Sequence, residues 1–263
     1  MVRAATTRGA AARAVAGADT IEIKATLPDP RVRQALARFG LTASNDETRY
    51  IYFFDTPGLD LLRAGIIARA RRVVGDAHDS TVKLRPVDPR DVPRKWHKFR
   101  DFKIEADASE ADMVRSASFS MPVGKGLIKR VADGRKPIAE IFSAEQEDFL
   151  MSMAGRAIDF AGLAVLGPLV AQRWEFVDPG CPWPITAELW KRGDGKRLME
   201  VSIRAPAAQA AAAVGGFMAF LQEVGVERDE SQQSKTRWAL DYYVEKLTRA
   251  PARPATRASS SPR

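Results

Sequence analysis

The segment Thr20-Ile21-Glu22-Ile23-Lys24-Ala25-Thr26-Leu27 decides the fold. Apolar residues alternate with polar ones along most of it. This period of two is typical of a half-buried β-strand, in which successive side chains point to opposite faces of the sheet. One face is apolar, while Glu22 and Lys24 share the other. In an ordinary sheet the charged face would meet bulk water, which is the simplest interpretation.

The same design returns in later segments, where charged residues again share one strand face. These residues are Arg69 and Arg71, Lys83 and Arg85, Lys103 and Glu105, and Glu200 and Arg204. If the strands that carry them close on themselves, the charged faces line one lumen that holds both signs of charge. Arg173, on a further predicted strand, would join them.

Eight segments are predicted to be strands, because they are rich in β-branched and aromatic residues and end at turn residues. They span residues 20–27, 48–55, 66–74, 80–86, 99–106, 170–177, 185–190 and 197–204. Helices are predicted over 28–39, 59–64, 206–223 and 232–247. Mostly short connections favour antiparallel pairing. The sequence therefore predicts an α+β fold, a closed eight-stranded antiparallel β-barrel with helices packed outside.

One large domain accounts for most of the 263 residues, of which 45% are hydrophobic. We expect it to span residues 19–247, with a disordered basic leader over 1–18 and a disordered tail over 248–263. Residues 108–167 contain helical stretches broken by Pro and Gly and are predicted to be a helical insertion. Two placements stay open for this insertion, a lid on the lumen or packing outside the barrel.

The formal net charge of +8 lies mainly at the two ends of the chain, which carry seven arginines and no acidic residue. Since the rest is close to neutral, nucleic acid is not an expected partner. The single cysteine excludes an internal disulfide, and with only two histidines the chain offers no zinc cluster. No apolar run is long enough to cross a bilayer. We expect a cytoplasmic protein with no membrane partner, and its oligomeric state stays open.

A charged lumen needs a reason, because burying each charge costs several kcal/mol unless the charge is paired. In the predicted barrel the cations outnumber the acids. A surplus of buried cations indicates an anionic ligand. The residues therefore predict a compact, phosphate-rich ligand, with a divalent cation held by the carboxylates.

Several short motifs follow one another along the chain. They are Thr20-Ile21-Glu22-Ile23-Lys24, Phe53-Phe54-Asp55-Thr56-Pro57, Ala68-Arg69-Ala70-Arg71, Thr81-Val82-Lys83, Glu200-Val201-Ser202 and Ser234-Lys235. Their order and spacing resemble the CYTH domain, or triphosphate tunnel metalloenzyme family, over nearly all of residues 19–247. Thiamine triphosphatases, inorganic triphosphatases and class IV adenylate cyclases belong to that family. The resemblance implies an eight-stranded tunnel that binds triphosphate through basic residues and Mg²⁺ or Mn²⁺ through acidic ones.

Carried over to this chain, the resemblance implies six phosphate ligands, namely Lys24, Arg69, Arg71, Lys83, Arg173 and Lys235. It implies metal binding by Glu22 and Glu200 and a catalytic role for these two and Lys24. Strand alternation adds Arg85 and Lys103 as further phosphate ligands and Glu105 as a further metal ligand.

The chain departs from the family pattern at positions that are usually acidic. Thr20 stands in place of the first glutamate, Ser202 in place of the last, and Trp190-Lys191 near a third acidic position. Asp19, Glu188 or Asp194 could compensate. The leading hypothesis is metal-dependent hydrolysis of inorganic, nucleoside or thiamine triphosphate. The alternatives are a non-catalytic module that binds triphosphate or polyphosphate, and an adenylate cyclase.

Overall fold

Nine strands form the centre of the computed structural model, which describes residues 20–108, 113–124, 126–155, 157–227 and 234–249. The leader and most of the tail predicted from the sequence lie outside these ranges, and so does Asp19, one of the three acidic residues that could compensate. The strands are β1 (Thr20–Leu27), β2 (Glu47–Asp55), β3 (Ile66–Val73), β4 (Asp79–Leu84), β5 (Phe102–Ala108), β6 (Met113–Pro122), β7 (Ala164–Asp178), β8 (Cys181–Lys191) and β9 (Arg197–Pro206).

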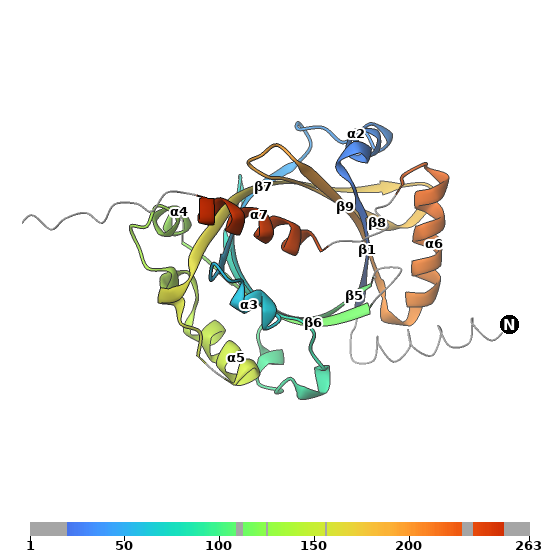
Figure 1. Cartoon of the computed structure of the whole chain (residues 1–263). Helices are drawn as coiled ribbons and strands as arrows, with labels where there is room; N and C mark the ends of the chain where they lie inside the picture. The colour runs from blue at the N-terminus through green and yellow to red at the C-terminus, as the bar shows by residue number, and fades with distance from the viewer. Residues whose placement is uncertain (1–19, 109–112, 125, 156, 228–233, 250–263) are drawn as a thin grey trace, which may run out of the picture.

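The sheet closes on itself in the order β1-β5-β6-β4-β3-β2-β7-β8-β9, and β9 pairs back with β1. Figure 1 looks along this barrel. Every neighbouring pair is antiparallel except β1 and β5, which run parallel with Ile21 beside Ala106. The predicted closed barrel is confirmed, but its eight antiparallel strands are corrected to nine strands in a mixed sheet.

The additional strand is β6, which lies in the segment predicted to be a helical insertion. It pairs with both β4 and β5 and so belongs to the barrel wall. Sequence reasoning missed it because its lumen-facing positions, Ser116, Ser118 and Ser120, have little strand preference. Ser120 Oγ lies 2.9 Å from the hydroxyl of Thr81 on β4, so this serine has a polar partner on the neighbouring strand.

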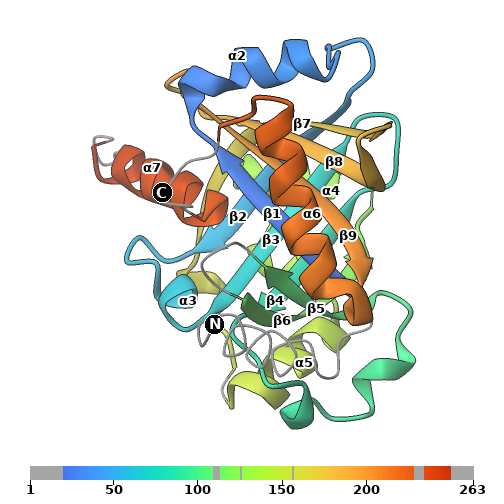
Figure 2. The same cartoon turned by 90° about the vertical axis from the view of Figure 1, so that its right-hand side faces the viewer.

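Helices cover the outside of the barrel, as predicted. They are α2 (Asp29–Arg38), α3 (Asp60–Arg63), α4 (Leu127–Ala132), α5 (Ala144–Ala154), α6 (Ala210–Glu223) and α7 (Lys235–Arg249). Short 3₁₀ turns are η1 (Pro89–Asp91), η2 (Trp96–Lys98), η3 (Ile138–Ile141), η4 (Phe160–Gly162) and η5 (Ala207–Gln209). Figure 2 shows α6 lying along the outer face of β1, β8 and β9. There Phe217 and Leu221 pack with Ile21 and Ile23, all fully buried, so the apolar face of the opening strand points outward and its charged face inward.

The segment after β6 packs against the barrel wall and does not cover the lumen (Figure 1). Phe149 of α5 stacks edge-on against Trp96 and Phe119 at centroid distances of 5.3 and 6.1 Å. The buried amide of Gln146 donates hydrogen bonds to the carbonyl oxygens of Ser80 and Phe119. These contacts fix α5 to β4 and β6 from outside.

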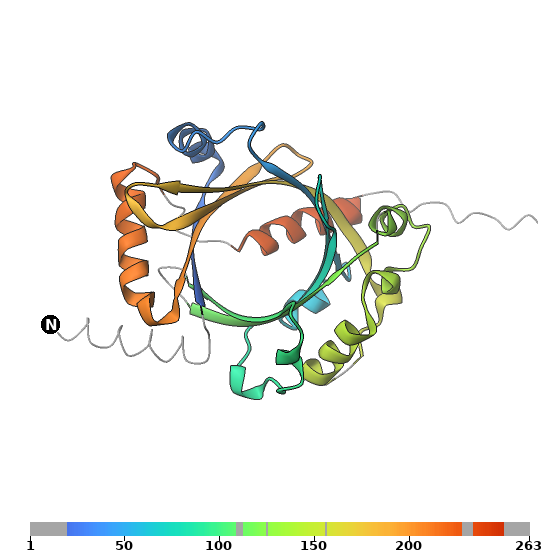
Figure 3. The same ribbon diagram turned by 180° about the vertical axis from the view of Figure 1, so that it is seen from behind.

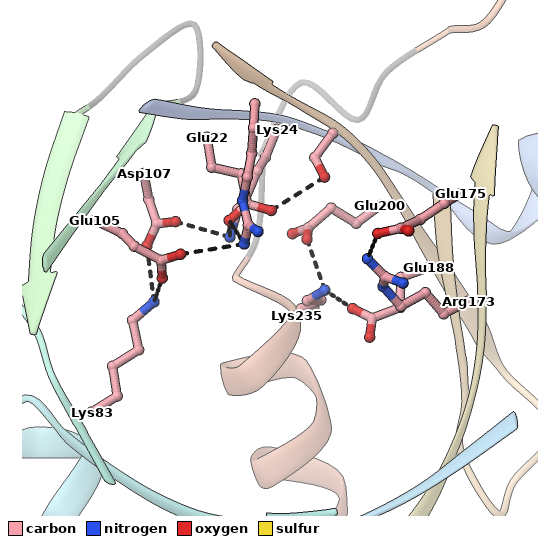
Figure 4. Close-up of polar contacts among 12 residues, drawn as sticks. Glu22, Lys24, Lys83, Glu105, Asp107, Arg173, Glu175, Glu188, Glu200 and Lys235 are labelled. Atoms are coloured by element: carbon pink, nitrogen blue, oxygen red, sulfur yellow. Dashed lines mark hydrogen bonds and ion pairs between the residues drawn. The ribbon is translucent and has the colours of Figure 1, made fainter. Parts of the chain in front are cut away.

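Helix α7 lies across one end of the barrel, and Figure 3 shows it at the far end when the barrel is seen from behind. Leu240 and Tyr243 pack there against Phe53 and Trp190. The hydroxyl of Tyr243 donates a 2.6 Å hydrogen bond to the carbonyl oxygen of Pro168. Lys235, the first residue of the helix, reaches into the lumen, where its ammonium contacts Glu188 and Glu200 (Figure 4). Across the described ranges, no helix has the length and apolar character needed to cross a membrane.

Candidate functional site

The charged faces of the strands line the lumen, and the strand register places polar residues of neighbouring strands opposite one another. Glu22 and Lys24 of β1 lie opposite Arg204 and Ser202 of β9. Lys24 Nζ is 3.1 Å from Glu22 Oε2, and Ser202 Oγ donates a 3.3 Å hydrogen bond to Glu22 Oε1. Burial raises the pKa of Glu22, but the charges of Lys24 and Arg204 outweigh it and leave the pKa lowered. Glu22 is thus ionised at neutral pH.

Asp107 of β5 organises one group of cations, of which Figure 4 shows Lys24 and Lys83. Its carboxylate lies 2.9 Å from Lys24 Nζ, 3.2 Å from Lys83 Nζ and 3.7 Å from an Arg85 nitrogen. Asp107 is only 3% exposed, and although burial raises its pKa, these cations lower it well below its usual range. Sequence reasoning missed Asp107, but the alternation of Lys103 and Glu105 extended by two residues would have found it.

Lys235, the first residue of α7, organises a second group (Figure 4). Its ammonium forms an ion pair with Glu188 of β8 and another, 2.7 Å long, with Glu200 of β9. It also lies 4.9 Å from the centroid of the Trp190 ring. Burial lowers the pKa of Lys235, but the two glutamates outweigh it and raise the pKa overall.

Arg69 of β3 stands apart from these ion pairs. Its Nε is buried and has no hydrogen-bond partner, and within the described part of the chain no carboxylate lies within ion-pair distance of its guanidinium. Burial and the neighbouring charge of Arg71 lower the pKa of Arg69 to about 10. A buried, unpaired guanidinium is costly, and a bidentate anion such as phosphate is its natural partner.

The other predicted phosphate ligands, apart from Lys103, have internal partners. Arg71 pairs with Asp79 at 3.0 Å, and Arg173 pairs with Glu175 on its own strand, as Figure 4 shows. Lys103 lies at the start of β5 and is exposed.

A cavity of about 500 Å³ opens at the end of the lumen away from α7. Lys103, Glu105 and Arg204 line it from the strands, together with His97 and Phe102. Arg204 is 3.2 Å from Glu105 across this opening. The cavity thus lies beside the start of β5 and the ends of β1 and β9, and charges of both signs line it.

The predicted metal ligands do not come together as one group. Glu105 pairs with Arg204 and, at 4.0 Å, with Lys83, and these contacts lie on the far side of Lys24 from Glu200 (Figure 4). Among the residues that the structure describes, no three acidic, histidine or cysteine side chains are arranged to hold a metal. Two carboxylates do converge on a single cation position, because Glu188 and Glu200 both contact the ammonium of Lys235.

That geometry fits Mg²⁺ or Mn²⁺ arriving with phosphate. Mg²⁺ is usually bound by one or two carboxylates together with substrate phosphates and water, and a cage of protein ligands alone is uncommon. Glu188 is one of the residues that could compensate for Trp190-Lys191 at the usually acidic position. Glu188 lies two residues earlier and directly opposite Glu200, whereas Trp190 packs beside Phe53 and Lys191 is exposed. Asp194 pairs with Arg192 in the β8–β9 turn and does not compensate.

Solved structures share this fold. A candidate adenylate cyclase from Bacillus halodurans matches with a TM-score of 0.57 and 14% identity, over 84% of this chain and 98% of that one. HpAC1 from Hippeastrum, a candidate adenylyl cyclase with a dominant triphosphatase activity, matches with a TM-score of 0.60 and 15% identity, over 84% and 95%. No family model and no curated protein matches the chain. The resemblance predicted from the motifs is thus confirmed at the level of the fold.

Proposed function

We propose that this protein binds a triphosphate inside the barrel and hydrolyses its terminal phosphoanhydride with one Mg²⁺ or Mn²⁺ ion. The observation that carries the proposal is Arg69, a half-buried arginine whose buried Nε has no hydrogen-bond partner in the described part of the chain. The triphosphatase activity of HpAC1, which has the same fold, supports it. A phosphate bound by Arg69 would replace the hydrogen bonds that its guanidinium lost on burial.

Cations from several strands would hold the phosphate chain. We assign this role to Lys24, Arg69, Arg71, Lys83, Arg173 and Lys235, with Arg85 at the side of the lumen and Lys103 at its entrance. Although burial lowers the pKa of Lys24, the carboxylates around it raise the pKa overall, so this residue stays protonated. It therefore acts as a fixed positive charge near the scissile phosphate, and a role in accepting a proton is not assigned to it.

The carboxylates divide into two roles in this proposal. Glu188 and Glu200 would hold the metal ion, and Glu22 on the neighbouring strand β1 would join them only by giving up its ion pair with Lys24. When bound, the ion neutralises phosphate charge and orients water for attack. Glu105 and Asp107 instead position cations, because their contacts are Lys24, Lys83, Arg85 and Arg204.

A binding module without turnover is the second candidate. It is favoured by the ion pairs of the lumen, because each proposed metal ligand already contacts a basic side chain. Adenylate cyclase activity ranks third. The candidate cyclase from Bacillus halodurans has the same fold. The lumen contacts in the described part of this chain are mainly ion pairs, which would bind phosphate and not recognise an adenine base.

Phosphate release separates these candidates. We would measure it from inorganic triphosphate, ATP and thiamine triphosphate, with Mg²⁺, with Mn²⁺ and with a chelator. The wild type should release phosphate only with metal, and Glu200→Gln should abolish it, whereas Glu245→Gln on the exposed face of α7 should not. Metal-independent binding of triphosphate without release would establish the binding module. Formation of cyclic AMP from ATP would establish a cyclase.

A further inference from the structure

Glu188 and Glu200 are direct cross-strand neighbours in the β8–β9 pair. Their side chains are 15% and 11% exposed, so water screens them only in part. Two like charges opposite each other destabilise a sheet unless a cation lies between them. Lys235 supplies that cation in the free protein.

The side chain of Lys235 is suited to leave this position. It is the first residue of α7, so only the residues that follow it along the chain belong to the helix. A lysine ammonium is a point charge on a flexible stem and makes no fixed bidentate contact with either glutamate.

We propose that Lys235 is an exchangeable cation, which keeps divalent metal out of the Glu188–Glu200 pair until a triphosphate draws its ammonium away. This proposal rests on the proposed function, because the same two glutamates are the metal ligands there. The ammonium and the metal ion cannot occupy one position. A triphosphate that attracts Lys235 therefore opens the pair for metal, and the metal favours triphosphate by the same factor.

Because of this exchange, triphosphate binds first and the metal ion binds second. Without anion, Glu188 keeps a second cation, since an Arg49 nitrogen lies 3.8 Å from it. Removal of Lys235 alone should therefore uncover the site without leaving both glutamates unpaired. The expected gain in metal affinity is at least about tenfold, because a unit charge within 4 Å in a partly buried site is worth more than 1.4 kcal/mol.

The test measures Mn²⁺ binding to the full-length protein with no phosphate present, by electron paramagnetic resonance of free Mn²⁺ and by calorimetry. Lys235→Met should bind Mn²⁺ at least about tenfold more tightly than the wild type. Lys235→Arg, which keeps the charge, should bind as weakly as the wild type. The matched control Lys246→Met, at an exposed lysine of the same helix, should change nothing. Adding Glu188→Gln to Lys235→Met should remove the gain and so locate the ion.

An equal Mn²⁺ affinity in the wild type and Lys235→Met overturns the exchange, and so does a gain that survives Glu188→Gln. Circular dichroism melting shows whether each variant is folded, and Lys235→Gln replaces Lys235→Met if the latter unfolds. The measurement contains no turnover. If Lys235→Met binds Mn²⁺ more tightly but the wild type releases no phosphate, the cation exchange holds and the proposed hydrolysis fails. If the wild type releases phosphate but Lys235→Met binds Mn²⁺ no more tightly, the hydrolysis holds and the exchange fails.

Discussion

Arg69 and Arg72 lie three residues apart on β3 and face opposite sides of the barrel. Arg69 points into the lumen and its buried Nε lacks a partner, whereas the guanidinium of Arg72 stacks 4.2 Å above the ring of Tyr50 on the outer face. On the outer face, the Arg72 guanidinium thus has an aromatic partner. In the lumen, Arg69 Nε has no partner among the described residues and is available to a ligand. This pair provides a variant and its control on one strand.

Replacing Arg69 should separate stability from binding. Arg69→Met removes a buried charge without a partner, so the free protein should melt at a higher temperature. Its affinity for inorganic triphosphate should fall about 10- to 100-fold, the value of a charge-assisted hydrogen bond. Calorimetric titration and thermal melting measure the two effects. Arg72→Met, the control, should bind triphosphate as tightly as the wild type. An unchanged affinity in Arg69→Met would show that Arg69 does not bind the triphosphate.

Asp107 should be needed for the folded state without ligand. In Asp107→Asn the cations of Lys24, Lys83 and Arg85 lose their shared carboxylate, and breaking a buried ion pair from one side costs on the order of 3–5 kcal/mol. Urea unfolding should show this loss. Saturating triphosphate should restore more stability to Asp107→Asn than to the wild type, because phosphate replaces the missing charge. The exposed pair of Asp148 and Lys95 provides the control, and Asp148→Asn should leave both values unchanged.

Glu188 should contribute to stability in a defined pH window. Burial raises its pKa, but the charge of Lys235 and its hydrogen bond outweigh it and lower the pKa from 4.5 to about 2. Between these values the unfolded chain binds more protons than the folded one, so stability rises with pH there and is lost as pH falls through about 2. The contribution is on the order of 3 kcal/mol.

Denaturant unfolding between pH 2 and 5 checks this window. Glu188→Gln should flatten the pH dependence by the amount that Glu188 contributes. Glu245→Gln, on the exposed face of α7, should leave the slope as in the wild type. A slope that does not change in Glu188→Gln would show that the Glu188–Lys235 ion pair adds no net stability.

Lys103 should act on the rate of binding. It is exposed and lines the cavity at the open end of the lumen, so its charge meets an incoming anion before the buried cations do. Lys103→Gln should lower the association rate constant of triphosphate a few-fold at low salt and have little effect at high salt, because salt screens steering between exposed charges. Stopped-flow binding at two ionic strengths measures it. Lys196→Gln, in the β8–β9 turn, is the control, and a change confined to the dissociation rate would contradict steering.

The alternation of residues 20–27 predicted a strand with two unlike faces, because that is the physical meaning of a period of two, and the same pattern in later segments predicted a closed barrel. Charged faces repeated on several strands predicted the lumen and most of its cations. Strand β6 escaped prediction because its serines carry neither an apolar pattern nor a strand preference, and only pairing with β4 and β5 makes it a strand.

What the tertiary structure alone decided is which charges meet. Glu105 and Glu200 look alike in sequence, yet the register places one beside Arg204 and the other beside Glu188 and Lys235. Asp107 became the centre of a cation group only because β5 lies next to β1, which no local pattern specifies. Periodicity fixes the face on which a side chain lies, whereas its partner depends on strand order and register, which arise from contacts far apart in the chain.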